Sequence, residues 1–144
     1  MRERKAIYEL LLEDPSNLIP MPGVFELLDA LGARELSPGI ASTSPRNQVD
    51  TVLLGLQIVA RFRAVVAGDN ALPTKPAPDV YLRATEEQGI ATARCLEDNV
   101  TGITAAKAAG LYAIAVPNRY TAHQDLTRAD ARVENLGEVV TLMR

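Results

Sequence analysis

The chain has 144 residues, a formal net charge of −3 and a hydrophobic fraction of 47%. This length allows one domain with a sizeable core, and the weak negative charge offers no basic footprint for nucleic acid or a membrane surface. The single cysteine, Cys95, excludes an internal disulfide and lies in an apolar run, which favours a buried thiol. Without a signal core or a membrane-length apolar run, we expect a cytoplasmic protein.

The first 33 residues predict two helices joined by a stiff connector. Apolar residues recur at helical spacing over 2–13, and Asp14-Pro15-Ser16-Asn17 ends that pattern. The two prolines within 19–23 favour an extended connector, because proline disfavours helix in the residue before it. A second apolar pattern predicts a helix over Val24–Ala33.

A short buried strand is predicted at Gly39–Ala41, followed by the turn Ser42-Thr43-Ser44-Pro45. Small hydroxyl residues between a strand and a helix leave backbone N–H groups free, which is typical of an anion site. The alternative is that these residues only cap the next helix, predicted over 46–54.

The middle of the chain predicts a second strand and a loop that carries a lysine. A helical turn is expected at 58–62 and a buried strand at Ala64–Ala67. Three prolines around Lys75 stiffen its loop, which favours a positioned charge over a freely solvated one. A helix should follow from Asp79 to about Gln88.

The third strand, predicted at Arg94–Leu96, ends in two adjacent carboxylates, Glu97 and Asp98. A helix is predicted over Thr101–Ala109. Two carboxylates between a strand and a helix are typical of a Mg²⁺ site, since Mg²⁺ prefers oxygen ligands and keeps water and phosphate as the others.

The remaining segments predict a fourth strand at Tyr112–Val116, a polar loop at 121–129, an edge strand at 132–133 and a closing helix at Leu136–Met143. The loop holds the only histidine, His123, which we expect to be a surface residue. Alternating strands and helices predict a parallel sheet covered on both faces. The hydroxyl turn, the lysine loop and the carboxylate pair should then meet beyond the carboxyl ends of the strands.

The order of these motifs resembles the haloacid dehalogenase (HAD) superfamily. The segments that carry the resemblance are Ile40-Ala41-Ser42-Thr43-Ser44-Pro45, Lys75-Pro76-Ala77-Pro78-Asp79 and Leu96-Glu97-Asp98-Asn99-Val100-Thr101-Gly102. They are most similar to the phosphatase and beta-phosphoglucomutase-like branch, which has a helical cap. The resemblance runs from about Met21 to the C-terminus and implies a three-layer Rossmann-like α/β core acting on a small phosphorylated metabolite.

The resemblance also implies roles for individual residues. Ser42 would bind the transferring phosphoryl group through its hydroxyl, and Thr43 would add its backbone N–H. Lys75 would neutralise charge on the phosphate and the nucleophile. Glu97 and Asp98 would hold Mg²⁺, which agrees with the charge stabilisation that phosphoryl transfer needs.

Two further positions bear on the predicted site. Asn47, which with Arg46 lies just past the hydroxyl turn, would contact the substrate or lie on the helix surface. Asn99 stands where this branch commonly has serine, a modest departure from its pattern.

The main departure is at the front of the chain. The branch begins with an Asp-x-Asp motif after an N-terminal strand, and its first aspartate is the nucleophile. No such motif precedes Ser42: Asp14 lies between helices and Asp29 lies inside one. We therefore expect residues 1–20 to be a remnant of the cap and 21–144 to be the core, without the first strand and most of the cap.

The missing strand would lie in the middle of the sheet. The strands at Gly39–Ala41 and Arg94–Leu96 should then either pair directly or leave a gap. A gap would expose sheet edges, which favour a dimer.

Two functional interpretations stay open, beside a receiver-like domain that fits the motif order poorly. The first is an incomplete phosphatase or phosphomutase, from a late start, a gene error or a fragment, that is inactive without its nucleophile. The second is a non-catalytic module that binds phosphate or a protein.

Overall fold

The structure, a computed structural model, describes residues 2–68 and 71–143. Its α-helices are α1 (Arg2–Glu13), α2 (Val24–Ala33), α3 (Arg46–Gly55), α4 (Asp79–Gln88), α5 (Val100–Ala108) and α6 (Leu136–Leu142). Its strands are β1 (Gly39–Pro45), β2 (Ala64–Gly68), β3 (Arg94–Glu97), β4 (Tyr112–Ala115) and β5 (Ala131–Arg132). Single turns of 3-10 helix lie at Pro15–Asn17 and Val59–Arg61. The predicted α/β class and order of elements are confirmed.

Local sequence signals explain where several helices begin and end. Gly89 ends α4 with a φ of 67°, a left-handed conformation that glycine adopts without strain. The Asn99 side chain caps α5 by accepting a hydrogen bond from the backbone N–H of Gly102 at 2.8 Å. Asn135 caps α6 in the same way through the N–H of Glu138, at 3.2 Å. Asparagine at position 99 therefore still provides the cap that starts the helix after the carboxylate pair.

Strand β1 is longer than predicted. The hydroxyl residues 42–44 belong to the strand, because β1 pairs with β2 from Gly39↔Ala64 to Pro45↔Gly68. The register shifts between Ala41 and Pro45, so the hydroxyl residues occupy an irregular stretch rather than a separate turn. The helix α3 begins directly afterwards, at Arg46.

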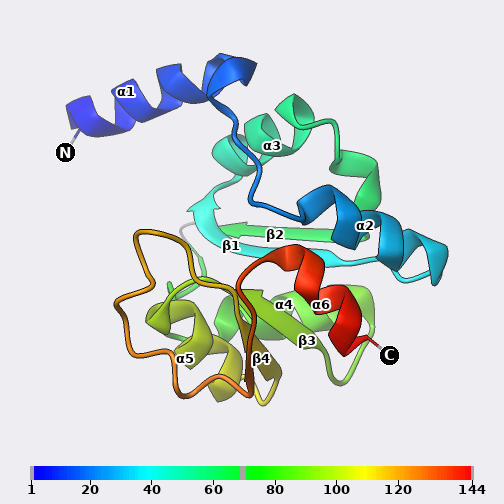
Figure 1. The fold of residues 1–144 in the computed structure, drawn as a ribbon. Coiled ribbons are helices and arrows are strands. Elements are labelled where there is room, and N and C mark those ends of the chain that lie inside the picture. The colour runs from blue at the N-terminus through cyan, green and yellow to red at the C-terminus, as the bar shows by residue number, and fades with distance from the viewer. Residues whose placement is uncertain (1, 69–70, 144) are drawn as a thin grey trace.

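Within the described residues the strands form two separate sheets, β1-β2 and β3-β4-β5, and every pair is parallel. Strands β1 and β3 do not pair with each other. Of the two predicted arrangements, the gap is therefore the one observed. Figure 1 shows β1 and β2 lying above β3 and β4.

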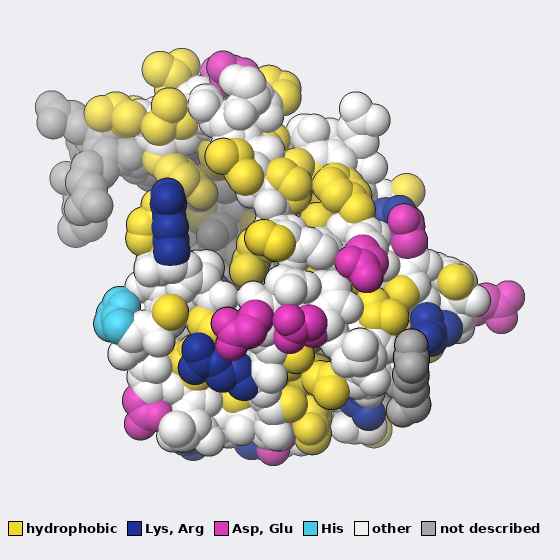
Figure 2. Space-filling view, in the orientation of Figure 1, with side chains coloured by type: hydrophobic (Ala, Val, Ile, Leu, Met, Phe, Trp, Pro, Cys, Tyr) yellow, Lys and Arg dark blue, Asp and Glu magenta, His cyan; other side chains and the backbone are white. Residues whose placement is uncertain are grey.

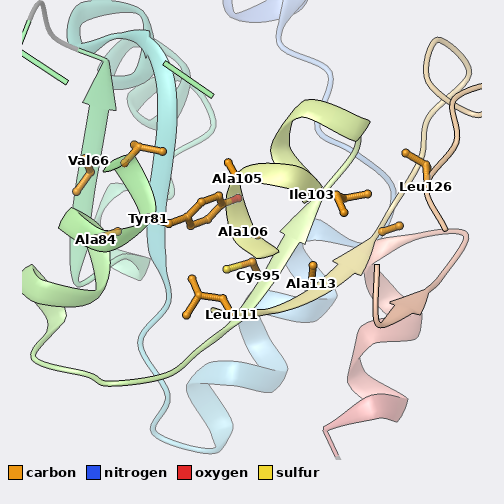
Figure 3. Packing of buried hydrophobic residues seen from close by; sticks show 12 residues of the cluster. Val66, Tyr81, Ala84, Cys95, Ile103, Ala105, Ala106, Leu111, Ala113 and Leu126 are labelled. Atoms are coloured by element: carbon orange, nitrogen blue, oxygen red, sulfur yellow. The ribbon is translucent and has the colours of Figure 1, made fainter. Parts of the chain in front are cut away.

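Two helices connect the sheets through the core. Leu27 and Leu28 are neighbours on α2 but belong to different hydrophobic clusters. Leu27 packs with residues of β4 and α6, whereas Leu28 packs with residues of α3 and β2. On the other side, Tyr81 of α4 packs in one cluster with Val66 of β2 and Cys95 of β3 (Figure 3). Burial on both helices thus stabilises the two sheets as one body despite the missing pairing.

Helix α1 extends away from this body and contacts mainly α3 (Figure 1). Four of its apolar side chains are more than half exposed: Ile7, Tyr8, Leu10 and Leu11. Figure 2 shows hydrophobic side chains gathered over this upper part of the molecule. The predicted division into a cap remnant at 1–20 and a core at 21–144 stays a prediction. None of the described helices is long and apolar enough to cross a membrane.

Candidate functional site

Lys75 lies between the two sheets. Its ammonium group donates a hydrogen bond to the backbone carbonyl of Ala41 in β1, at 3.0 Å, and pairs with the carboxylate of Glu97 at the end of β3. The lysine side chain is 14% exposed and that of Glu97 is 8% exposed. Two of the predicted site residues therefore meet beside Ser42, the residue after Ala41.

The Glu97 carboxylate points into the protein. Its Oε1 atom accepts a hydrogen bond from the Tyr81 hydroxyl as well as the ion pair from Lys75. Burial first, and then the negative charge of Glu97, raise the pKa of Tyr81 far above its usual value, so the phenol stays protonated and donates. A Cβ at Gly102 would collide with this carboxylate, so the glycine in α5 provides the space for Glu97.

Asp98 is held differently from its neighbour. It is partly buried, and its two oxygens each accept one amide hydrogen bond: Oδ1 from Asn99 at 2.8 Å and Oδ2 from Asn118 at 2.9 Å. Asn118 follows β4, so two adjacent strand ends orient one carboxylate. A carboxylate oxygen has two lone pairs, so each Asp98 oxygen can still bind another partner.

The residues fit Mg²⁺ only in part. Asp98 has oxygen lone pairs available, as Mg²⁺ requires. The observed conformation of Glu97 commits one of its oxygens to Lys75 and Tyr81, and its role as a metal ligand stays a prediction. Among residues 2–68 and 71–143, no group of three or more His, Cys, Asp or Glu side chains could hold a metal ion. Of the two predicted metal ligands, Asp98 is thus the one whose oxygens are less committed in the observed conformation.

Two hydroxyl residues of β1 line a hollow of about 190 Å³ together with the residues that lead to Lys75. Ser42, Thr43, Gly68 and Thr74 are among its lining residues. The Ser42 hydroxyl accepts a hydrogen bond from the N–H of Ser44 at 3.1 Å, a local contact within the irregular part of the strand. The hollow offers hydroxyl groups for an anion, although the Lys75 ammonium points toward Glu97.

The structure also describes the other residues that the sequence analysis named. Asn47 is exposed on the first turn of α3, where its backbone carbonyl accepts from the Thr51 hydroxyl at 2.8 Å. His123 is exposed, as predicted. Cys95 is buried, also as predicted, and burial raises the pKa of its thiol to about 12.

Two residues of the site have no sequence prediction: Tyr81, which binds Glu97, and Asn118, which binds Asp98. Asn118 follows the fourth predicted strand, so its position at the same sheet edge was a usable signal. Tyr81 looks like an ordinary apolar residue of a helix in the sequence. In the structure Tyr81 packs in one cluster with Cys95 of β3 and Ala105 of α5 (Figure 3). Only this tertiary packing brings its hydroxyl to the Glu97 carboxylate.

The chain matches a known protein family and several of its members in sequence. The sequence profile described as haloacid dehalogenase-like hydrolase matches residues 2–116. The chain is 39% identical over 126 residues to protein CbbY from Rhodobacter capsulatus, covering 84% of this chain and 56% of that protein. It is 34% identical over 120 residues to putative phosphatase YhcW from Bacillus subtilis, covering 82% of this chain and 54% of that protein.

Solved structures of related proteins share the fold of this chain. CbbY from Rhodobacter sphaeroides in complex with phosphate superimposes with a TM-score of 0.78 and 29% identity, covering 83% of this chain and 55% of that one. A mutant of that protein, in complex with xylulose-(1,5)bisphosphate, gives a TM-score of 0.77. The chain spans about half the length of the curated relatives it matches. By the extent of these matches, the chain belongs to the haloacid dehalogenase-like hydrolase family, in its phosphatase and phosphoglucomutase-like branch.

Proposed function

We propose that this chain forms the phosphate-handling part of a Mg²⁺-dependent phosphohydrolase that acts on a small phosphorylated sugar. The observation that carries the proposal is the position of Lys75, a mostly buried cation beside Ser42 at the carboxyl ends of β1 and β3. Support also comes from the relatives, since the CbbY structures contain phosphate and a sugar bisphosphate. A cytoplasmic location stays a prediction from the sequence.

The proposed division of labour follows the chemistry of each group. Ser42 and Thr43 would bind phosphoryl oxygens, Lys75 would neutralise their charge, and Asn47 would contact the rest of the substrate. Asp98, oriented by Asn118, would be the carboxylate ligand of Mg²⁺. When bound, Mg²⁺ would withdraw charge from the phosphoryl oxygens.

We further propose that the 144 residues do not turn over substrate by themselves, because the sequence contains no Asp-x-Asp motif to supply a nucleophile. Loss of a nucleophile costs about 10⁶-fold in rate in well-studied hydrolases. The test is an assay of the purified chain with Mg²⁺ and an aryl phosphate, and the expected result is no turnover above background. Turnover that Asp98→Ala abolishes would refute the proposal and require another nucleophile.

The second candidate is a non-catalytic module, favoured by the retention of Lys75, Ser42 and Asp98 without a nucleophile. Titration calorimetry with phosphate and Mg²⁺ separates the two. Binding without turnover by a folded monomer supports the module, whereas a molten or insoluble chain supports an incomplete enzyme. Among the residues that the structure describes, β1 and β3 each leave one strand edge unpaired, which also suggests a dimer, and light scattering would measure it.

A further inference from the structure

Three acceptors from the described part of the chain surround the Lys75 ammonium. An ammonium group has three N–H donors. In the structure Nζ contacts three acceptors: the carbonyl of Ala41 at 3.0 Å, the hydroxyl of Tyr81 at 3.4 Å, and Oε1 of Glu97. An anion that binds Lys75 must therefore replace at least one of these contacts.

Glu97 is the contact that an anion would replace, because it alone carries negative charge. The protein holds this carboxylate in a prepared position. The Tyr81 hydroxyl donates to it, the Lys75 ammonium lies 4.8 Å from the centre of the Tyr81 ring, and the absent side chain of Gly102 leaves room for it. These contacts favour the state in which the Glu97 carboxylate neutralises the charge of Lys75.

We propose that Glu97 is an internal counter-anion that a phosphate group displaces from Lys75. Tyr81 is the positioning residue that holds the Glu97 carboxylate against Lys75. This inference rests on the proposed function and specifies how the site discriminates among ligands. A binding-competent state that is only partly populated lowers the apparent affinity by the population of that state. Phosphate affinity of the free chain should therefore be limited by the Glu97 contact.

The same competition predicts the class of ligand. Glu97 is attached to the chain, so it meets Lys75 at a high effective concentration and without loss of translational freedom. A singly charged anion such as acetate or chloride offers Lys75 no more charge than Glu97 does. A dianionic phosphoryl group offers more charge and more acceptor oxygens, which favours phosphate over monoanions.

The experiment titrates inorganic phosphate into the full chain in the presence of a chelator, so that no metal links the anion to a carboxylate. Calorimetry or amide NMR gives the affinity of the native chain and of three variants. Glu97→Gln removes the competing charge, and we expect about tenfold tighter binding. Tyr81→Phe keeps every charge, loosens the hold on Glu97 and also removes one acceptor of the Lys75 ammonium, so we expect a gain of about twofold to fivefold. Glu86→Gln, on the exposed face of α4, is the control for net charge and should change little.

The outcomes separate this inference from the proposed function. If the native chain binds phosphate and Glu97→Gln binds it no better, or gains no more than Glu86→Gln, the inference is wrong and the proposed function stands. If no variant binds phosphate without metal, the inference is wrong, and the same titration with Mg²⁺ in place of the chelator decides the proposed function separately. If Glu97→Gln does not fold, as circular dichroism would show, Gly102→Ala decides, because its methyl displaces the Glu97 carboxylate without removing the Tyr81 hydroxyl or the Ala41 carbonyl. Tighter binding by Gly102→Ala supports the inference and unchanged binding refutes it.

Discussion

The ion pair between Lys75 and Glu97 gives the strongest prediction about stability. It links the loop after β2 to the end of β3, between sheets that share no backbone pairing. With exposures of only 14% and 8%, the two side chains form a largely buried pair. Removing one partner leaves the other charge buried and uncompensated, which typically costs 3–5 kcal/mol. Because Lys75 keeps some contact with solvent, we expect about 3 kcal/mol of lost unfolding free energy for Glu97→Gln.

The assay is urea denaturation followed by circular dichroism, with a double-mutant cycle. For a domain of this size, 3 kcal/mol corresponds to a fall of roughly 10 °C in the melting temperature. Lys75→Met should lower the unfolding free energy by a similar amount. The double variant Lys75→Met, Glu97→Gln should lower it by clearly less than the sum of the two single losses, since it leaves no unpaired buried charge. The matched control is Glu87→Gln, which breaks the exposed pair with Arg83 and should cost less than about 1 kcal/mol. Small losses of unfolding free energy that add up in the double variant would refute the conclusion that Lys75 and Glu97 form a buried, coupled pair.

Three further predictions concern the surroundings of the pair. Gly102→Ala should lower the melting temperature, although alanine favours helix, because the added methyl displaces the Glu97 carboxylate; a stabilised variant would contradict this. Asn118→Ala should weaken the binding of Mn²⁺, used as a probe for Mg²⁺, because Asp98 loses the amide that orients its carboxylate, whereas unchanged affinity in a Mn²⁺ titration would remove Asn118 from the site. Cys95, with its pKa raised to about 12 by burial, should react with a disulfide reagent only after unfolding in urea, and rapid labelling of the native chain would show that the thiol is accessible.

Local signals in the sequence were enough to predict most of the fold. Helix α2 has the predicted bounds, and Gly89 ends α4 as expected, because glycine and proline act within a few residues. The end of β1 was not predictable in the same way. Residues 42–44 look like a turn, but the long-range pairing of Pro45 with Gly68 extends the strand through them.

The sequence predicted where the candidate site should lie but not its contacts. The order of Ser42, Lys75 and Asp98 along the chain, together with the rule that parallel strands end at one edge, predicts that they gather there. The structure brings Lys75 to Glu97, and the roles of these residues stay predictions. The direction in which the Glu97 carboxylate points was not predictable. It depends on the Tyr81 hydroxyl and on the space above Gly102, which exist only once α4 and α5 have packed.

The central claim is that the carboxyl ends of β1 and β3 form a phosphate site around Lys75. The most direct measurement is an amide NMR titration of the chain with inorganic phosphate and Mg²⁺. The account predicts saturable shifts at Ser42, Thr43 and Lys75, and their loss in a Lys75→Met variant that still folds. Shifts confined to other surfaces, or shifts at Ser42 and Thr43 that Lys75→Met leaves unchanged, would contradict it.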